Sequence, residues 1–126
     1  MTISPLDPEA ARTGLKAAGL QNVLIRKMRQ SGLKYNANAD AELFVRVVVL
    51  TSRAVNGETL GYGAHLELSF REKAFVKRQP ATYFFAPTWF KGSVTVANPK
   101  VFKRELAVGL VKLYNQFVGD YKRYNR

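Results

Sequence analysis

Hydrophobic and polar residues alternate with a period of two along residues 41–72, and the alternation is interrupted at Asn56-Gly57. Such alternation is typical of β-strands that bury one face. Asn-Gly is the preferred pair for a two-residue type I′ turn, so the sequence predicts a hairpin in which Val55 pairs with Glu58. In this register the numbers of opposing residues add up to 113 throughout the hairpin.

The predicted register separates an apolar face from a mixed face. The mixed face places Arg46 opposite Glu67, a favourable charge pair across the strands. The same face also carries apolar residues such as Val48 and Leu50, which make it partly suitable for binding a partner. A slip of one residue would expose the whole apolar set, which is therefore the predicted core face. Its pairs are Leu43 with Phe70, Val45 with Leu68, Val47 with Leu66, Val49 with Ala64 and Thr51 with Tyr62.

A helical period appears on both sides of this hairpin. Leu20, Leu24 and Met28 are spaced for one helix face, and Gly32 predicts a Schellman ending with Leu33 against Met28. Before it, Asp7-Pro8 predicts a helix start, but two glycines argue against one continuous helix. After the hairpin, Asn98-Pro99 predicts the start of a long helix. Its apolar stripe is Phe102, Leu106, Leu110, Leu113, Phe117 and Tyr121, and Gly109 within it predicts close packing.

Residues 78–96 predict a third long strand, broken near Pro87 or Gly92, with a fourth short strand over 93–96. The fold class is therefore α+β, a two-layer sandwich in the order helix, three or four antiparallel strands, helix, with both helices on one sheet face. Residues 1–126 are expected to form a single domain, in which residues 1–19 are an N-terminal arm or a short helix.

Five of the chain's fifteen aromatic residues lie between positions 83 and 90, with basic residues on either side. Alternation predicts Tyr83, Phe85 and Trp89 on one face of the strand, and Phe84 and Phe90 on the other. One small core cannot hold both sets, so some of these rings are expected to meet a partner chain or to lie under the N-terminal segment. The predicted partner-binding residues are Lys77, Arg78, Tyr83, Phe84, Trp89, Phe90 and Lys91.

The formal net charge is +11 and is unevenly placed, since residues 71–126 hold twelve Lys and Arg residues against three acids. Such a surface favours a nucleic acid, an anionic lipid surface or an acidic protein face. No apolar run reaches the length of a membrane span, and no signal-peptide pattern is visible. The location is therefore the periplasm or cell envelope if a signal segment was removed, and otherwise the cytoplasm.

The sequence favours no enzymatic chemistry. There is no cysteine, and the one histidine, His65, has only Glu67 beside it on its strand face, too few ligands for a metal. Glycines 61 and 63 lie inside a predicted strand, so they do not form a phosphate-binding loop. No serine has the surroundings of a nucleophile elbow. The sequence thus predicts no catalytic residue, no cofactor and no metal.

Three partner classes compete for the aromatic cluster. Exposed rings beside basic residues could stack on single-stranded nucleic acid. The order helix, three strands, helix is also that of double-stranded-RNA-binding domains, but the final helix here lacks their lysine-rich start. A membrane wedge is disfavoured because the segment is predicted to be a strand.

Four features follow one another along residues 20–125: "SGL" at 31–33, "NGETLGYGAHLELSF" at 56–70, Trp89, and "FVGDYKRYN" at 117–125. This layout resembles small bacterial envelope proteins of the periplasmic or lipoprotein type, and is similar in build to the lipopolysaccharide-assembly lipoproteins. The resemblance implies a non-enzymatic accessory or assembly subunit, acting through protein–protein contacts in an oligomer or larger complex of the bacterial cell envelope. The alternative is a nucleic-acid-binding module that uses the basic C-terminal half and the cluster 83–90.

Overall fold

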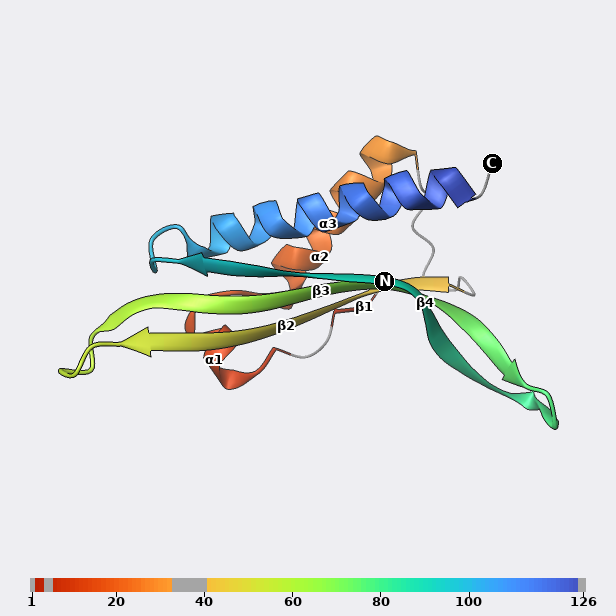
Figure 1. Cartoon of the computed structure of the whole chain (residues 1–126), viewed down its shortest axis with the longest axis horizontal. Helices are drawn as coiled ribbons and strands as arrows, with labels where there is room; N and C mark the ends of the chain where they lie inside the picture. Colours follow the sequence, from red (N-terminus) through yellow and green to blue (C-terminus); the bar gives the residue numbers. More distant parts are fainter. Residues whose placement is uncertain (1, 4–5, 33–40, 125–126) are drawn as a thin grey trace.

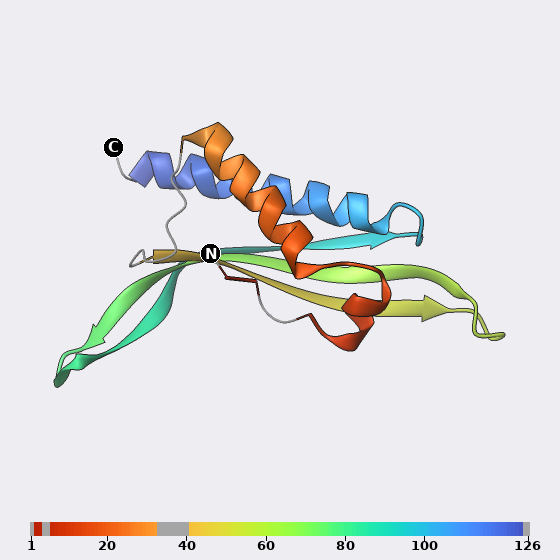
Figure 2. The same ribbon diagram turned by 180° about the vertical axis from the view of Figure 1, so that it is seen from behind.

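Two helices lie across one face of a sheet of long strands (Figures 1 and 2). The computed structural model describes residues 2–3, 6–32 and 41–124. The sheet order is β1-β2-β3-β4, and α2 and α3 cover the same face of it. The predicted α+β two-layer fold is confirmed. The elements are β1 (Thr2–Ile3), α1 (Pro8–Arg12), α2 (Ala17–Ser31), β2 (Ala41–Arg53), β3 (Thr59–Val76), β4 (Gln79–Ala97) and α3 (Phe102–Tyr124).

The fourth strand is not the predicted one. Residues 93–96 belong to β4, which runs unbroken from Gln79 to Ala97, and the fourth strand is β1. β1 pairs in parallel with β2, Thr2 opposite Phe44 and Ile3 opposite Val45. The prediction of a separate strand was wrong because Gly92 stays within the ladder, opposite Glu67.

The β2–β3 register is confirmed from Leu43 opposite Phe70 to Ser52 opposite Gly61, but the turn is of another type. Within this turn, Gly57 is the one residue with a positive φ, +86°. Its N–H donates to Ala54 O at 2.9 Å. This is a three-residue loop with a glycine bulge, since a type I′ turn would need a positive φ at Asn56 as well. A second irregularity at Leu60, between the pairs Ser52–Gly61 and Arg53–Thr59, restores the predicted register.

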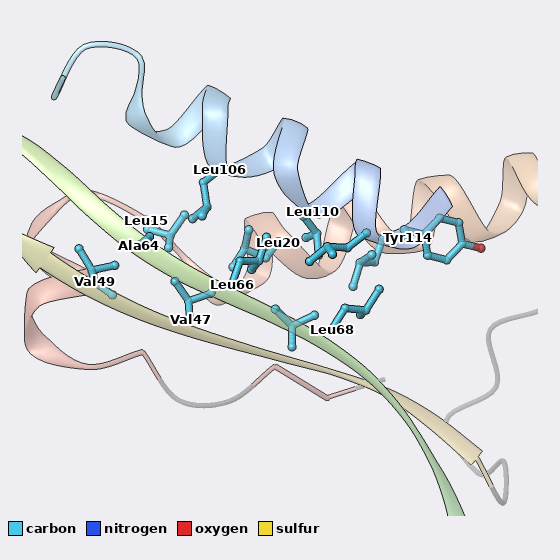
Figure 3. Packing of buried hydrophobic residues seen from close by; sticks show 14 of the residues in the cluster. Leu15, Leu20, Val47, Val49, Ala64, Leu66, Leu68, Leu106, Leu110 and Tyr114 are labelled. Atoms are coloured by element: carbon cyan, nitrogen blue, oxygen red, sulfur yellow. The ribbon is translucent and has the colours of Figure 1, made fainter. Parts of the chain in front are cut away.

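The core lies between this sheet face and the helices (Figure 3). Val45, Leu66 and Leu68 of the sheet are fully buried against the apolar stripe of α3. Gly109 packs against the sheet as the sequence predicted, since a Cβ there would lie 3.4 Å from Thr95 Oγ1 of β4, an ordinary van der Waals distance. α3 and the edge of the sheet are therefore in contact at this point.

The helix ends have specific caps. Asp7 Oδ1 accepts a hydrogen bond from Ala10 N–H at 2.8 Å at the start of α1, within the region 1–19. α2 ends at Gly32 with φ +81°, in the left-handed region that glycine favours. The predicted contact of Leu33 with Met28 lies outside the described residues. Asn98 Oδ1 accepts from Lys100 N–H and Val101 N–H in the turn that leads into α3.

A part-buried pair of hydroxyl groups joins the two covering helices. Tyr114 of α3 and Ser31 of α2 lie 2.7 Å apart, hydroxyl to hydroxyl. Ser31 Oγ also lies 2.9 Å from the Lys27 carbonyl, to which it donates its one hydrogen, so the Tyr114 hydroxyl is the donor to Ser31. Burial raises the pKa of Tyr114. The phenol thus stays neutral between the helices.

Candidate functional site

β3 and β4 continue beyond the end of β2 as a two-stranded projection. The first residue of β2, Ala41, pairs with Glu72, and past this point the described strands β3 and β4 pair only with each other. Residues 73–85 form this projection, here called the β-arm, which leans away from the body of the molecule (Figure 1). Lys77 and Arg78 form its turn and are exposed. The β-arm thus carries several residues of the predicted partner-binding set into solvent.

A bulge decides which rings share a face. Phe70 pairs with Trp89, but its neighbour Arg71 pairs with Pro87, so Thr88 is an extra residue in β4. Proline has no N–H for the ladder, and bulges are where strands tolerate it. The simple alternation predicted from sequence therefore fails here. Trp89 and Phe84 therefore lie on the face of the sheet that the helices cover. Phe90, Tyr83 and Phe85 lie on the opposite face, here called the open face.

One side of the β-arm is a cluster of rings around a lysine. Tyr83 packs against Phe75 with centroids 6.4 Å apart and edge-to-face against Phe85 at 6.2 Å. Lys73 Nζ lies 4.2 Å from the centre of the Tyr83 ring, a cation–π contact. Phe75 is still 60% exposed and Tyr83 53% exposed. These contacts order the rings without removing them from water.

The other side of the β-arm carries Phe84, which is 53% exposed and lies opposite Ala74. This side continues the helix-covered face of the sheet, but α2 and α3 do not extend over the β-arm (Figures 1 and 2). Phe84 therefore lies on a strand face that the body leaves uncovered.

Trp89 and Lys91 lie in the body, apart from the β-arm. The Trp89 ring packs edge-to-face on Phe117 of the core at 5.2 Å, and its Nε1–H donates to Asp120 Oδ2 at 3.0 Å. Lys91 Nζ and Arg123 Nη1 each lie 3.8 Å from an oxygen of the same carboxylate. The indole hydrogen bond is the main cause that lowers the pKa of Asp120, and the two cations add to it. Trp89 thus serves the packing of α3 onto β4.

We expect the only tryptophan to report the ionisation of Asp120. Because the folded pKa lies below the ordinary 3.8, the stability that the carboxylate contributes is present above that value. It is lost as pH falls through the lower folded pKa. The nuclear magnetic resonance signal of the Trp89 indole N–H should shift with a midpoint below 3.8. Asp120→Asn keeps an oxygen acceptor and should show no such step; a wild-type midpoint at or above the ordinary value would contradict the assignment.

The sheet face away from the helices is partly apolar and open. Phe90 is 66% exposed on it, beside the exposed side chains of Val94, Val96 and Leu50. His65 packs over Gly92 of the neighbouring strand, where a Cβ would lie 2.7 Å from His65 Nε2. The predicted surface position of this histidine agrees with its exposure. The open face thus joins the aromatic side of the β-arm without a break in the sheet.

The predicted partner-binding set left out three residues that lie beside Tyr83 in the structure, although Phe85 was among the five rings of the segment 83–90. Lys73, Phe75 and Phe85 share the open side of the β-arm with Tyr83. The missing information was the turn at Lys77-Arg78, which places Phe75 opposite Tyr83.

The fold and its β-arm define a class, an α+β sandwich with an exposed two-stranded aromatic projection. No protein-family model and no curated protein sequence matches the chain. Among solved structures, it is similar to rare lipoprotein B from Shewanella oneidensis, at 10% identity and a TM-score of 0.38 over 100% of both chains. That neighbour is a lipoprotein by name, the type that the sequence layout resembles. A likeness this distant carries no argument about function, which rests on the residues of this chain.

Proposed function

We propose that the protein is a non-enzymatic accessory or assembly subunit of the bacterial cell envelope, and that it binds a protein partner through the β-arm. The residues that make this contact are Lys77 and Arg78 at the tip, Tyr83 and Phe84 on the two sides, and Phe90 on the adjoining open face. Trp89 and Lys91 support the surface from the body.

One observation carries the proposal: Phe75, Tyr83 and Phe84 are each more than half exposed on a hairpin that no third described strand supports. A two-stranded hairpin alone is marginally stable in water. Burying an aromatic side chain contributes about 1.5–3 kcal/mol, so a partner that covers these rings would also hold the hairpin in place. The basic tip would favour an acidic rim on that partner.

The proposed envelope location rests on the sequence layout at residues 20–125. No helix within the described ranges is long and apolar enough to cross a membrane. Fractionation of cells that carry the complete native gene tests the location. Recovery in the envelope fraction is expected, and recovery in the cytosol would contradict the proposal.

A nucleic-acid-binding module is the alternative function. Base stacking needs a free ring face. In the β-arm, Lys73 lies over the face of Tyr83, and Phe75 and Phe85 pack against the Tyr83 ring. We therefore expect any binding of labelled single- and double-stranded oligonucleotides to be independent of Tyr83. Tight binding with a steep salt dependence that Tyr83→Ser reduces would favour the alternative.

The proposed contact can be tested with a photoreactive amino acid at position 84. Illumination of cells that produce this variant should give one discrete adduct with another protein, because the ring at this position is uncovered. The matched control carries the same group at Val55, which is fully exposed in the β2–β3 loop at the opposite end of the sheet. An adduct at both positions, or at neither, would contradict a specific contact through the β-arm.

A further inference from the structure

The body of the molecule has a second free surface, at the outer edge of β4. β4 is the last strand of the sheet, and among the described strands only β3 pairs with it. Its final segment, Gly92–Ala97, reads "GSVTVA" and has neither a charge nor a proline. Exposed edges normally carry such residues to prevent pairing with another strand. Here they are missing over six consecutive positions.

A groove runs along this edge below α3. It has a volume of about 410 Å³ and is lined by Gly92–Val96 on the strand side. Gly109 of α3 lies against Ser93 and Thr95 of the strand, and Ser93 Oγ is buried between them without a hydrogen-bond partner in the described part of the chain. A strand laid against the outer edge of β4 would find the free backbone groups of that edge. The helix side of the groove consists of Glu105, Val108, Gly109, Lys112, Leu113 and Gln116.

The charges of the groove have a two-fold pattern. Glu105 and Lys112 lie on either side of Gly109, which is itself next to the middle of the edge segment at Ser93 and Thr95. Rotation by half a turn about an axis near Thr95 would exchange the two ends of the groove. It would place Glu105 of one copy beside Lys112 of the other, twice in the same assembly.

We propose that the occupant of this edge is a second copy of the chain, joined by antiparallel pairing of the two Gly92–Ala97 segments. The contact is isologous, so backbone N–H and C=O groups of each β4 bond to the other. The net charge of +11 per chain does not oppose it at the seam, because the paired segments are neutral. The crossed Glu105 and Lys112 pairs fix the direction of pairing. The β-arm takes no part in this contact.

Charge exchange across the axis tests the proposal by sedimentation velocity over a wide range of concentration. The wild type should show a reversible monomer–dimer equilibrium. Glu105→Lys and Lys112→Glu should each raise the dimer Kd about tenfold or more, because each creates two like-charge contacts. The double variant restores opposite charges at both contacts and should return Kd to within about threefold of the wild type.

Matched controls separate this contact from general charge effects and from the proposed function. Lys122→Glu and Glu58→Lys change the net charge equally at exposed positions outside the groove, and should leave Kd unchanged. Removal of the β-arm should leave the dimer intact. A wild type that is monomeric at all concentrations would overturn the proposal, and this is also the result expected if β4 pairs with a strand of another protein instead. A double variant whose dimer Kd is as high as that of the single variants would overturn it as well.

Discussion

Phe117→Ala is expected to lower the free energy of unfolding by about 3–5 kcal/mol. Phe117 is 3% exposed and lies at the centre of the aromatic part of the core. Its ring contacts those of Phe70 and Trp89, both at 5.2 Å, and that of Tyr121 at 5.6 Å. Alanine would leave a cavity bounded by three large rings from three different elements, which cannot all move inward together. Urea unfolding followed by circular dichroism measures the loss.

The control removes the same side chain from the other face of the sheet. Phe90 is 66% exposed, so Phe90→Ala should change the free energy of unfolding by less than about 0.5 kcal/mol. A loss at Phe90 comparable to that at Phe117 would mean that the open face is covered within the folded chain. That result would remove the basis for a binding surface on this side.

Replacing the β-arm by a short turn should abolish partner binding and leave the body folded. Glu72 and Ala86 face each other in the ladder, so an Asn-Gly pair in place of residues 73–85 can join them in register. No buried residue of the described core lies within 73–85, so the free energy of unfolding should change by about 1 kcal/mol or less. The protein that the probe at position 84 captures should no longer copurify with the shortened chain.

The free energy of unfolding and the copurification of the partner must both be measured on the shortened chain. Unchanged copurification with a folded body would place the contact elsewhere on the molecule and contradict the proposed role of the β-arm. Double replacement of Tyr83 and Phe84 by serine is a smaller version of the same change. It keeps the backbone of the β-arm and should reduce binding through the loss of ring burial alone.

The β2–β3 hairpin could be predicted in detail because its alternation is strict and only one register buries all of the apolar set. The faces of β4 could not be predicted beyond Pro87. The extra residue at Thr88 is a property of strand pairing, and the sequence around it only shows that a proline must be tolerated. β1 was missed for a related reason, since a strand of two residues has no period and exists through its partner, β2.

The candidate site was found in part. The density of rings and bases marked residues 77–91, but only the pairing of β3 with β4 showed that the segment divides in two. Tyr83 and Phe84 project into solvent with the β-arm, whereas Trp89 packs on Phe117. Phe75 lies in the cluster because the chain turns at Lys77-Arg78, where no glycine or asparagine predicts a turn. Aromatic content alone could not separate rings that stabilise the fold from rings left exposed.

The two irregularities in the β2–β3 hairpin have a consequence for how its length can vary. The glycine bulge at Gly57 and the extra residue at Leu60 each shift the pairing by one, and together they leave Val45 and Leu66 facing the core. An extra residue within the paired part of the hairpin exchanges the two sides of its strand, so it must be matched by a second irregularity nearby. An extra residue in the loop beyond Ala54 and Glu58 does not change this pairing, so the length of the loop can vary while the core stays the same.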